Sequence, residues 1–240
     1  MNISIIIPCY NEEDNIDYLV RKSKKILKNK KNQLILVNNG SKDQTSLKIK
    51  ENKKKYRNIK LLNIKKNIGF GDAIKKGINK CSNDIVGYTH ADREVDINDI
   101  TKGLKKLNKK DYIKKIFFIK GKRINKFKNG WTLSDVILTF LMTIFYSLLF
   151  GKFLIDIHAQ PVIFHKKFFK KQIFFPNDLT FDAAIYIKAK KNNLKIIRFP
   201  VIFNKKEKNF GIRSNDSFLK KIKNSLQQIL GGFYLFFKYL

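Results

Sequence analysis

The segment IVGYTHADRE, residues 85–94, joins a short apolar run to an acidic cluster. Residues 85–88 predict a buried strand, and Asp92 and Glu94 follow directly after it. A carboxylate at the carboxyl end of a strand in an α/β sheet faces the crevice where ligands bind. Its hard oxygens suit Mg²⁺ or Mn²⁺ bridging a diphosphate. Acidic residues after a strand also serve as turn or helix-capping residues, so this segment alone leaves both interpretations open.

The first half of the chain alternates such apolar runs with longer amphipathic stretches. This alternation predicts an α/β fold, with a mainly parallel central sheet flanked by helices. The 240 residues fit one domain with a small appendage. The predicted strands are residues 3–7, 34–37, 59–62, 85–88 and 116–119, and the predicted helices are residues 14–27, 44–54, 72–79 and 97–107.

The composition is strongly basic, with 51 Lys and Arg against 19 Asp and Glu and a net charge of +32. Such a charge is typical of proteins that bind nucleic acid or an anionic membrane. The excess is nearly all lysine spread along the whole chain, a pattern that an AT-rich genome also produces, so no nucleic-acid partner is expected. A basic polyanion-binding module remains the alternative from a different functional class.

Cysteine usage and apolar runs predict the compartment. Cys9 and Cys81 form neither a disulfide framework nor a zinc-site pattern, which indicates a reducing cytoplasm. The first residues show no export signal. The longest apolar stretch, residues 136–150, is shorter than the roughly 20 residues that a membrane span needs. We expect it to form a buried or interfacial helix.

Three further strand ends carry polar residues or glycines, as expected for the ligand-binding edge of such a sheet. They are residues 8–13 (PCYNEE), 38–45 (NNGSKDQT) and 67–73 (NIGFGDA). The second is also a turn that opens a helix, and capping by Ser41, Asp43 or Thr45 explains it equally well. The glycine pair in the third lets the backbone approach a ligand closely, and it also suits an ordinary turn.

In this order, these four segments resemble the family-2 nucleotide-sugar glycosyltransferases with the GT-A fold. The second half continues the resemblance in the manner of the dolichyl-phosphate-mannose-synthase-like branch. The resemblance implies one glycosyltransferase domain over residues 1–215, with a donor half at 1–120 and an acceptor half at 121–215. It implies the following nucleotide-sugar-binding residues: Pro8, Tyr10, Asn11, Glu12, Asn38, Asn39, Ser41, Asp43, Asn67, Gly69, Gly71, Ala91, Arg123, Asp156 and Lys206.

The acidic segment resembles the Asp-x-Asp metal motif of the family, with one departure. His90 stands where the first Asp is usual, which leaves Asp92 as the certain carboxylate and Glu94 two residues on. The resemblance implies that Asp92, Glu94 and His90 hold a divalent metal, Mn²⁺ or Mg²⁺, and a histidine favours Mn²⁺. This departure leaves a second interpretation open, in which the chain is a non-catalytic relative that binds nucleotide-sugar.

The resemblance implies transfer of a sugar from a UDP- or GDP-sugar, with inversion, to a polyprenyl-phosphate or glycan acceptor. Metal bound at Asp92 would help the diphosphate leave. Asp182 matches an acidic position beside the acceptor and would act as the base for a hydroxyl nucleophile. A phosphate nucleophile needs no base, and Asp182 would then only position it. Lys206 lies in a loop resembling one that closes over the nucleotide.

The C-terminal segment, residues 216–240, predicts an amphipathic helix, which Gly231 and Gly232 would weaken as a continuous helix. Lysines flank its apolar stripe. The stripe suits either a packing face or the surface of an anionic bilayer, which would place the protein peripherally on the inner face of the cell membrane. The stripe consists of Phe218, Ile222, Leu226, Ile229, Phe233 and Phe237.

Overall fold

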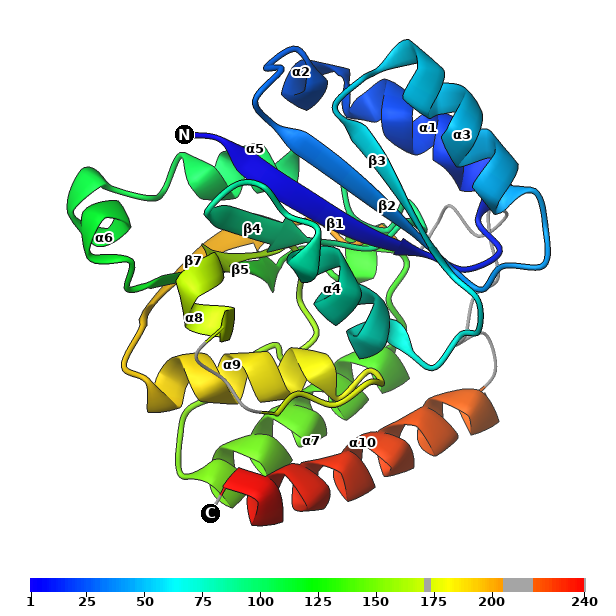
Figure 1. Cartoon of the computed structure of the whole chain (residues 1–240). Coiled ribbons are helices and arrows are strands. Elements are labelled where there is room, and N and C mark those ends of the chain that lie inside the picture. The colour runs from blue at the N-terminus through cyan, green and yellow to red at the C-terminus, as the bar shows by residue number, and fades with distance from the viewer. Residues whose placement is uncertain (171–173, 205–217, 240) are drawn as a thin grey trace.

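The computed structural model describes residues 1–170, 174–204 and 218–239 (Figure 1). One seven-stranded sheet forms its centre, in the order β3-β2-β1-β4-β6-β5-β7. Its strands are β1 (Ile3–Cys9), β2 (Gln33–Asn39), β3 (Ile59–Ile64), β4 (Ile85–Tyr88), β5 (Phe117–Arg123), β6 (Val162–His165) and β7 (Lys195–Val201). The helices are α1 (Glu13–Lys22), α2 (Lys24–Leu27), α3 (Thr45–Lys55), α4 (Phe70–Asn79), α5 (Asp99–Leu104), α6 (Lys109–Lys114), α7 (Leu133–Phe150), α8 (Lys166–Lys170), α9 (Phe181–Lys191) and α10 (Phe218–Tyr239).

The sheet is mainly parallel, as the alternation of apolar runs predicts. β1 pairs in parallel with β2 and β4, β2 with β3, and β5 with β7. β6 enters between β4 and β5 and is antiparallel to both. The predicted α/β fold, a mainly parallel sheet flanked by helices with a C-terminal helix, is confirmed.

Helices cover both faces of the sheet, which explains why strands such as β1 are apolar at nearly every position. Ile5 and Ile7 pack with α1, α3 and α5 in one core cluster. Ile6 points to the other face, into a cluster that contains residues of α4, α7, α9 and α10. Figure 1 shows α7 and α10 as the outermost layer on that second face, beyond α9.

Several element boundaries differ from the sequence expectation. Residues 14–27 form two helices because the chain breaks at Ser23, whose hydroxyl donates to the carbonyl oxygen of Leu19. The fifth strand extends to Arg123, so residues 120–123 lie within β5 and do not follow it. β5 gains this length because β7 pairs with it in parallel along its whole course.

The α7 helix has well-defined ends, but the rest of the protein buries little of it. Thr132 and Asp135 form a capping box at its start, and Gly151 ends it in the left-handed conformation. Within the described residues it is the one helix long and apolar enough to cross a membrane by length and composition, and 17% of it is buried. Of the two expected forms, buried or interfacial, the buried one is therefore wrong for the outer side of this helix.

The α10 helix also differs from one of the two expectations for it. Ile222, Leu226, Phe233 and Phe237 of the predicted stripe are exposed, but Ile229 packs against the core and the ring of Phe233 contacts that of Phe145, so the stripe is a packing face only in part. The buried side consists instead of residues such as Leu235 and Tyr239. The glycine pair does not interrupt the helix, which continues to Tyr239.

Candidate functional site

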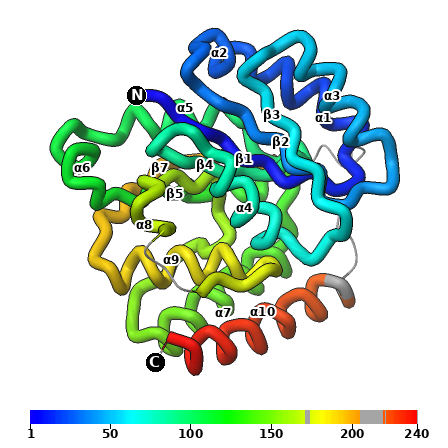
Figure 2. The backbone as a smooth tube through the Cα atoms, in the orientation of Figure 1, coloured from blue at the N-terminus to red at the C-terminus, as the bar shows by residue number. Residues whose placement is uncertain are grey.

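A pocket of about 1270 Å³ opens at the carboxyl ends of β1, β2 and β4. Residues from α4, from the segment 174–180 and from α10 form its other walls. Figure 2 shows how the chain brings α10, the last helix, beneath α9 and near the loops that enter α4. Nine of the predicted site residues line the pocket: Pro8, Tyr10, Glu12, Asn39, Asn67, Gly69, His90, Ala91 and Asp92.

The turns after β1 and β2 are joined by hydrogen bonds. The backbone N–H of Asn11 donates to the hydroxyl of Ser41 (3.0 Å), and that of Glu12 donates to the hydroxyl of Thr45 (2.8 Å). Asp43 accepts from Thr45 and from the N–H of Glu13. Asn11, Ser41 and Asp43 do not line the pocket, and in this structure they fix the shape of its rim.

Asn38 and Asn39 have different surroundings. Asn38 is engaged on both sides, since its Oδ1 accepts from the N–H of Ser41 and its Nδ2 donates to Asn63. Asn39 donates its Nδ2 to Asn67 and to the carbonyl oxygen of Gly69. Asn39 lines the pocket, and its Oδ1 is buried without a hydrogen-bond partner among the described residues. A buried acceptor without a donor is costly unless a ligand supplies one.

The glycines of the third segment allow close contact between two parts of the chain. A Cβ atom at Gly69 would lie 2.3 Å from the carbonyl oxygen of Asn177, and one at Gly71 would lie 2.4 Å from that of Pro176. Gly69 also has a φ of +127°. The glycines therefore let the start of α4 touch residues 176–178, which form the opposite wall of the pocket.

Acidic side chains gather on the β4 side of the pocket. Burial raises the pKa of Glu12 to about 7, and the neighbouring carboxylates of Asp92 and Asp43 also raise it. The ring of His90 lies 5.2 Å from that of Phe70, and Asp92 accepts from the N–H of Glu94. Glu94 does not line the pocket. Among the described residues no group of three His, Cys, Asp or Glu side chains is close enough to hold a metal by itself.

Asp182 lies beneath the pocket and is buried. Its Oδ1 accepts from the hydroxyl of Tyr88 (2.7 Å), and its Oδ2 accepts from Nε2 of Gln160 (3.2 Å). Burial by itself would raise the pKa of Asp182, but hydrogen bonding from His158 and the nearby Lys120 ammonium lower it to about 2. Asp182 does not line the pocket, and a carboxyl group of such low pKa is a weak base.

Arg123 and Asp156 form a buried ion pair away from the pocket. The backbone N–H and the Nε of Arg123 both donate to the Asp156 carboxylate. The guanidinium also lies over the ring of Trp131, 4.8 Å from its centre. Neither residue lines the pocket, and Lys206 lies outside the described residues.

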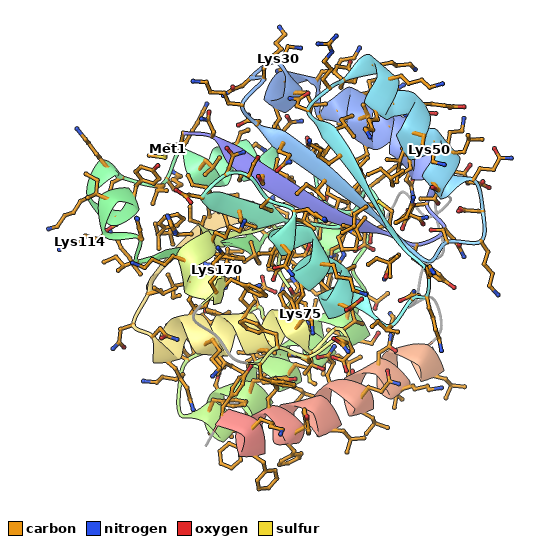
Figure 3. All side chains as sticks on the ribbon, in the orientation of Figure 1. Met1, Lys30, Lys50, Lys75, Lys114 and Lys170 are labelled. Carbon is orange, nitrogen blue, oxygen red and sulfur yellow. The ribbon has the colours of Figure 1, made fainter. Side chains whose placement is uncertain are left out.

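Sequence patterns missed the wall formed by the second half of the chain. Lys75 of α4, labelled in Figure 3, donates to the carbonyl oxygen of Phe175 (2.9 Å) and to the Asn177 side chain. Around it, aromatic and amide side chains from two distant segments line the pocket. They are Phe169, Phe174, Phe175, Leu179, Asn224, Gln227, Gln228, Leu230 and Tyr234.

The family model described as glycosyl transferase family 2 matches residues 4–174, which carry the four strand-end segments and about half of the residues that line the pocket. The chain belongs to glycosyltransferase family 2. The expected resemblance is therefore confirmed at the level of the family, whose members transfer sugars.

Two curated relatives of this family-2 chain match part of it. An uncharacterized glycosyltransferase of Synechocystis sp. is 35% identical over 94 residues, 38% of this chain and 30% of that protein. The dolichyl-phosphate beta-glucosyltransferase of Dictyostelium discoideum is 40% identical over 86 residues, 32% of this chain and 26% of that protein. These matches thus span less than a third of either relative.

A solved family-2-like structure matches nearly all of the chain. The glucosyl-3-phosphoglycerate synthase of Mycobacterium tuberculosis, solved with Mn²⁺, UDP and phosphoglyceric acid, superposes with a TM-score of 0.73. The match covers 98% of this chain and 78% of that one, at 15% identity. At this identity the likeness establishes the GT-A fold of the glycosyltransferase.

Proposed function

We propose that this family-2 glycosyltransferase moves a hexosyl group, with inversion, from a UDP- or GDP-sugar to a lipid-linked phosphate. The observation that carries the proposal is the composition of the pocket. Its β1–β2–β4 side offers Asn39, Glu12 and Asp92, whereas its far side adds a group of aromatic and aliphatic side chains among amides, including Phe174, Phe175 and Leu230. Such a division suits a polar donor at the strand ends and an acceptor with an apolar chain.

The buried Oδ1 of Asn39 supports a nucleobase at the polar end. The ring N–H of uracil or guanine is a donor, and Oδ1 is an acceptor that has no partner among the described residues. Binding of the base there would satisfy this atom. Both bases offer such a donor, so the donor nucleotide remains UDP or GDP in this proposal.

The carboxylates of Glu12 and Asp92 support a divalent metal. They face one pocket, and their mutual repulsion contributes to the raised pKa of Glu12. Mg²⁺ and Mn²⁺ are commonly held by one or two carboxylates together with substrate phosphates, which fits this small set of ligands. Asp92 would hold the ion, with His90 beside it, and the ion would supply charge neutralisation of the leaving diphosphate.

The environment of Asp182 favours a phosphate acceptor over a sugar hydroxyl. A hydroxyl nucleophile needs a base at the reacting atoms, and Asp182 is buried beneath the pocket with a pKa of about 2. A lipid phosphate is already an anion and needs none. Asp182 then acts as a positioning residue, which holds Tyr88 and Gln160 in place below the pocket. The dolichyl-phosphate acceptor named for the Dictyostelium relative is of the same class.

Calorimetry with UDP and with GDP, each with and without Mn²⁺, tests the donor site. We expect manganese-dependent binding of one nucleotide by the wild type and its loss in Asp92→Ala. Asp17→Ala, which removes an exposed carboxylate far from the pocket, should bind as the wild type does. If the folded protein binds neither nucleotide, the donor-site assignment fails and a polyanion-binding function becomes the better account.

Radiolabelled transfer then tests the acceptor. UDP-glucose and GDP-mannose would each be offered with a polyprenyl phosphate and, separately, with an oligosaccharide. We expect a labelled product that partitions into organic solvent. A labelled product only with the oligosaccharide would contradict the lipid-phosphate assignment while leaving sugar transfer intact.

A further inference from the structure

The outer sides of α7 and α10 carry a continuous series of exposed apolar side chains. On each helix these residues recur every three or four positions, which places them in one stripe. We call the two stripes together the docking face. It consists of Leu133, Ile137, Phe140, Leu141, Ile144 and Leu148 on α7, and of Leu219, Ile222, Leu226, Leu230, Phe233 and Phe237 on α10.

The two stripes lie next to each other because the helices run side by side in the same direction. Lys221 pairs with Asp135 near both helix starts (2.8 Å), and Phe150 contacts Phe236 near both ends. The inner sides of both helices pack into the same core cluster, so both outer sides face away from the protein. Figure 3 shows side chains projecting freely from α10 on the side away from α9.

These helices differ from ordinary surface helices because the side that faces away from the protein is also apolar. Phe140, Leu148 and Phe237 are 62%, 78% and 72% exposed. Single exposed apolar residues are common, but a patch of this extent marks a site that a membrane or a partner covers.

The charges around the docking face favour an anionic membrane. Residues 218–239 contain no Asp or Glu. The single acidic residue of α7, Asp135, is buried and paired with Lys221. Exposed lysines, Lys223 and Lys238 on α10 and Lys152 after α7, lie at the edges. A second copy of this chain would bring lysine against lysine, whereas anionic headgroups would neutralise them.

From these contacts we infer that α7 and α10 lie flat in the surface of an anionic bilayer, with the docking face inserted among the lipids. A spanning orientation of α7 would require it to leave the protein. Met142 and Tyr146 pack in the core, and the Tyr146 hydroxyl donates to the carbonyl oxygen of Gln228 (2.8 Å). These contacts hold α7 against the domain along its length.

The docking face also meets the pocket. Leu230 belongs to the docking face and lines the pocket, and Tyr234, one turn further, is half exposed and lines it as well. The mouth of the pocket therefore opens at the edge of the inserted surface. This extends the proposed function, on which it rests for the nature of the acceptor: a lipid-linked phosphate reaches the pocket directly from the leaflet.

Co-sedimentation of the full chain with vesicles tests the inference. Vesicles of phosphatidylcholine with about 30% phosphatidylglycerol would be compared with pure phosphatidylcholine, at low and high salt. We expect the wild type to bind the anionic vesicles and to be released by salt. Phe140→Gln together with Leu148→Gln should weaken binding at least tenfold. Neither residue lines the pocket.

A matched control removes two exposed apolar side chains elsewhere. Leu47→Gln with Ile113→Gln, on α3 and α6, should bind vesicles as the wild type does. Circular dichroism and nucleotide binding check that both double variants are folded. Equal vesicle binding by all three proteins would overturn the inference, as would a wild-type dimer that the Phe140/Leu148 variant dissociates. Vesicle binding without nucleotide binding would instead sink the proposed function alone.

Discussion

Lys120 offers a direct test of how the buried polar network beneath the pocket is charged. This β5 residue is fully buried, and its Nζ donates to the carbonyl oxygen of Ala159 (2.7 Å). Burial lowers the pKa of Lys120 to about 7, although the nearby carboxylate of Asp182 opposes the shift. We predict that Lys120→Met removes a pH dependence of stability that the wild type shows between pH 6 and pH 9.

The direction of this pH dependence follows from the protonation of Lys120 in the folded and unfolded chain. Above pH 7 the folded protein loses the Lys120 proton, whereas the unfolded chain keeps it up to the ordinary pKa of 10.5. The unfolded state then binds more protons, so stability rises with pH. A difference of one bound proton between the two states changes the free energy of unfolding by about 1.36 kcal/mol per pH unit. Between pH 6 and pH 9 this difference accumulates to nearly two proton·pH units. Lys120 should therefore contribute an increase of about 2.7 kcal/mol over that interval.

Urea unfolding of both proteins at pH 6, 7, 8 and 9 measures this contribution. The unfolding free energy of Lys120→Met minus that of the wild type should decrease by about 2.7 kcal/mol from pH 6 to pH 9, because other titrating groups are common to both. Lys122→Met, which changes an exposed lysine of the same strand, should show a constant difference from the wild type. A constant difference for Lys120→Met would refute the reasoning, since Lys120 would then keep one protonation state throughout.

Two further substitutions test the walls of the pocket. Asn39→Ala should weaken binding of whichever nucleotide binds by about 1 to 2 kcal/mol, because it removes the free Oδ1 acceptor; titration calorimetry measures this loss, and unchanged affinity would place the base elsewhere. Gly71→Ala should destabilise the protein by about 1 to 3 kcal/mol, because its Cβ would lie 2.4 Å from the carbonyl oxygen of Pro176. Thermal unfolding measures the change, and an unaltered midpoint would show that residues 176–178 can move away.

The fold was predictable because its signals are local. Ile-rich runs and the amphipathic stretches between them predicted β1 to β4 and the helices around them. The antiparallel β6 carries no local mark of where it inserts, because its pairing with β4 and β5 depends on a connection of many residues. The strand-end motifs likewise predicted the β1–β2–β4 side of the pocket, since carboxyl ends of parallel strands meet at one edge.

The far side of the pocket could not be predicted in the same way. Phe175 and Tyr234 reach the pocket from segments far apart in sequence, and each looks like an ordinary core aromatic residue by pattern. The side of α10 that faces the protein was equally hidden. Both sides of this helix are apolar, with Leu235 on one and Phe237 on the other, so periodicity revealed a stripe without showing which side was buried.

The glycine pair of α10 has a geometric consequence for catalysis at a membrane. A Cβ at Gly231 would lie 2.7 Å from Thr180, and one at Gly232 would lie 2.6 Å from Phe145. Because these two positions have no side chain, α10 is in direct contact both with the segment that precedes α9 and with α7. One helix is about 10 Å across. On the proposed membrane orientation, the height of sugar transfer above the lipids is therefore set by a single helix diameter, and larger residues at positions 231 and 232 would lengthen the reach required of the acceptor.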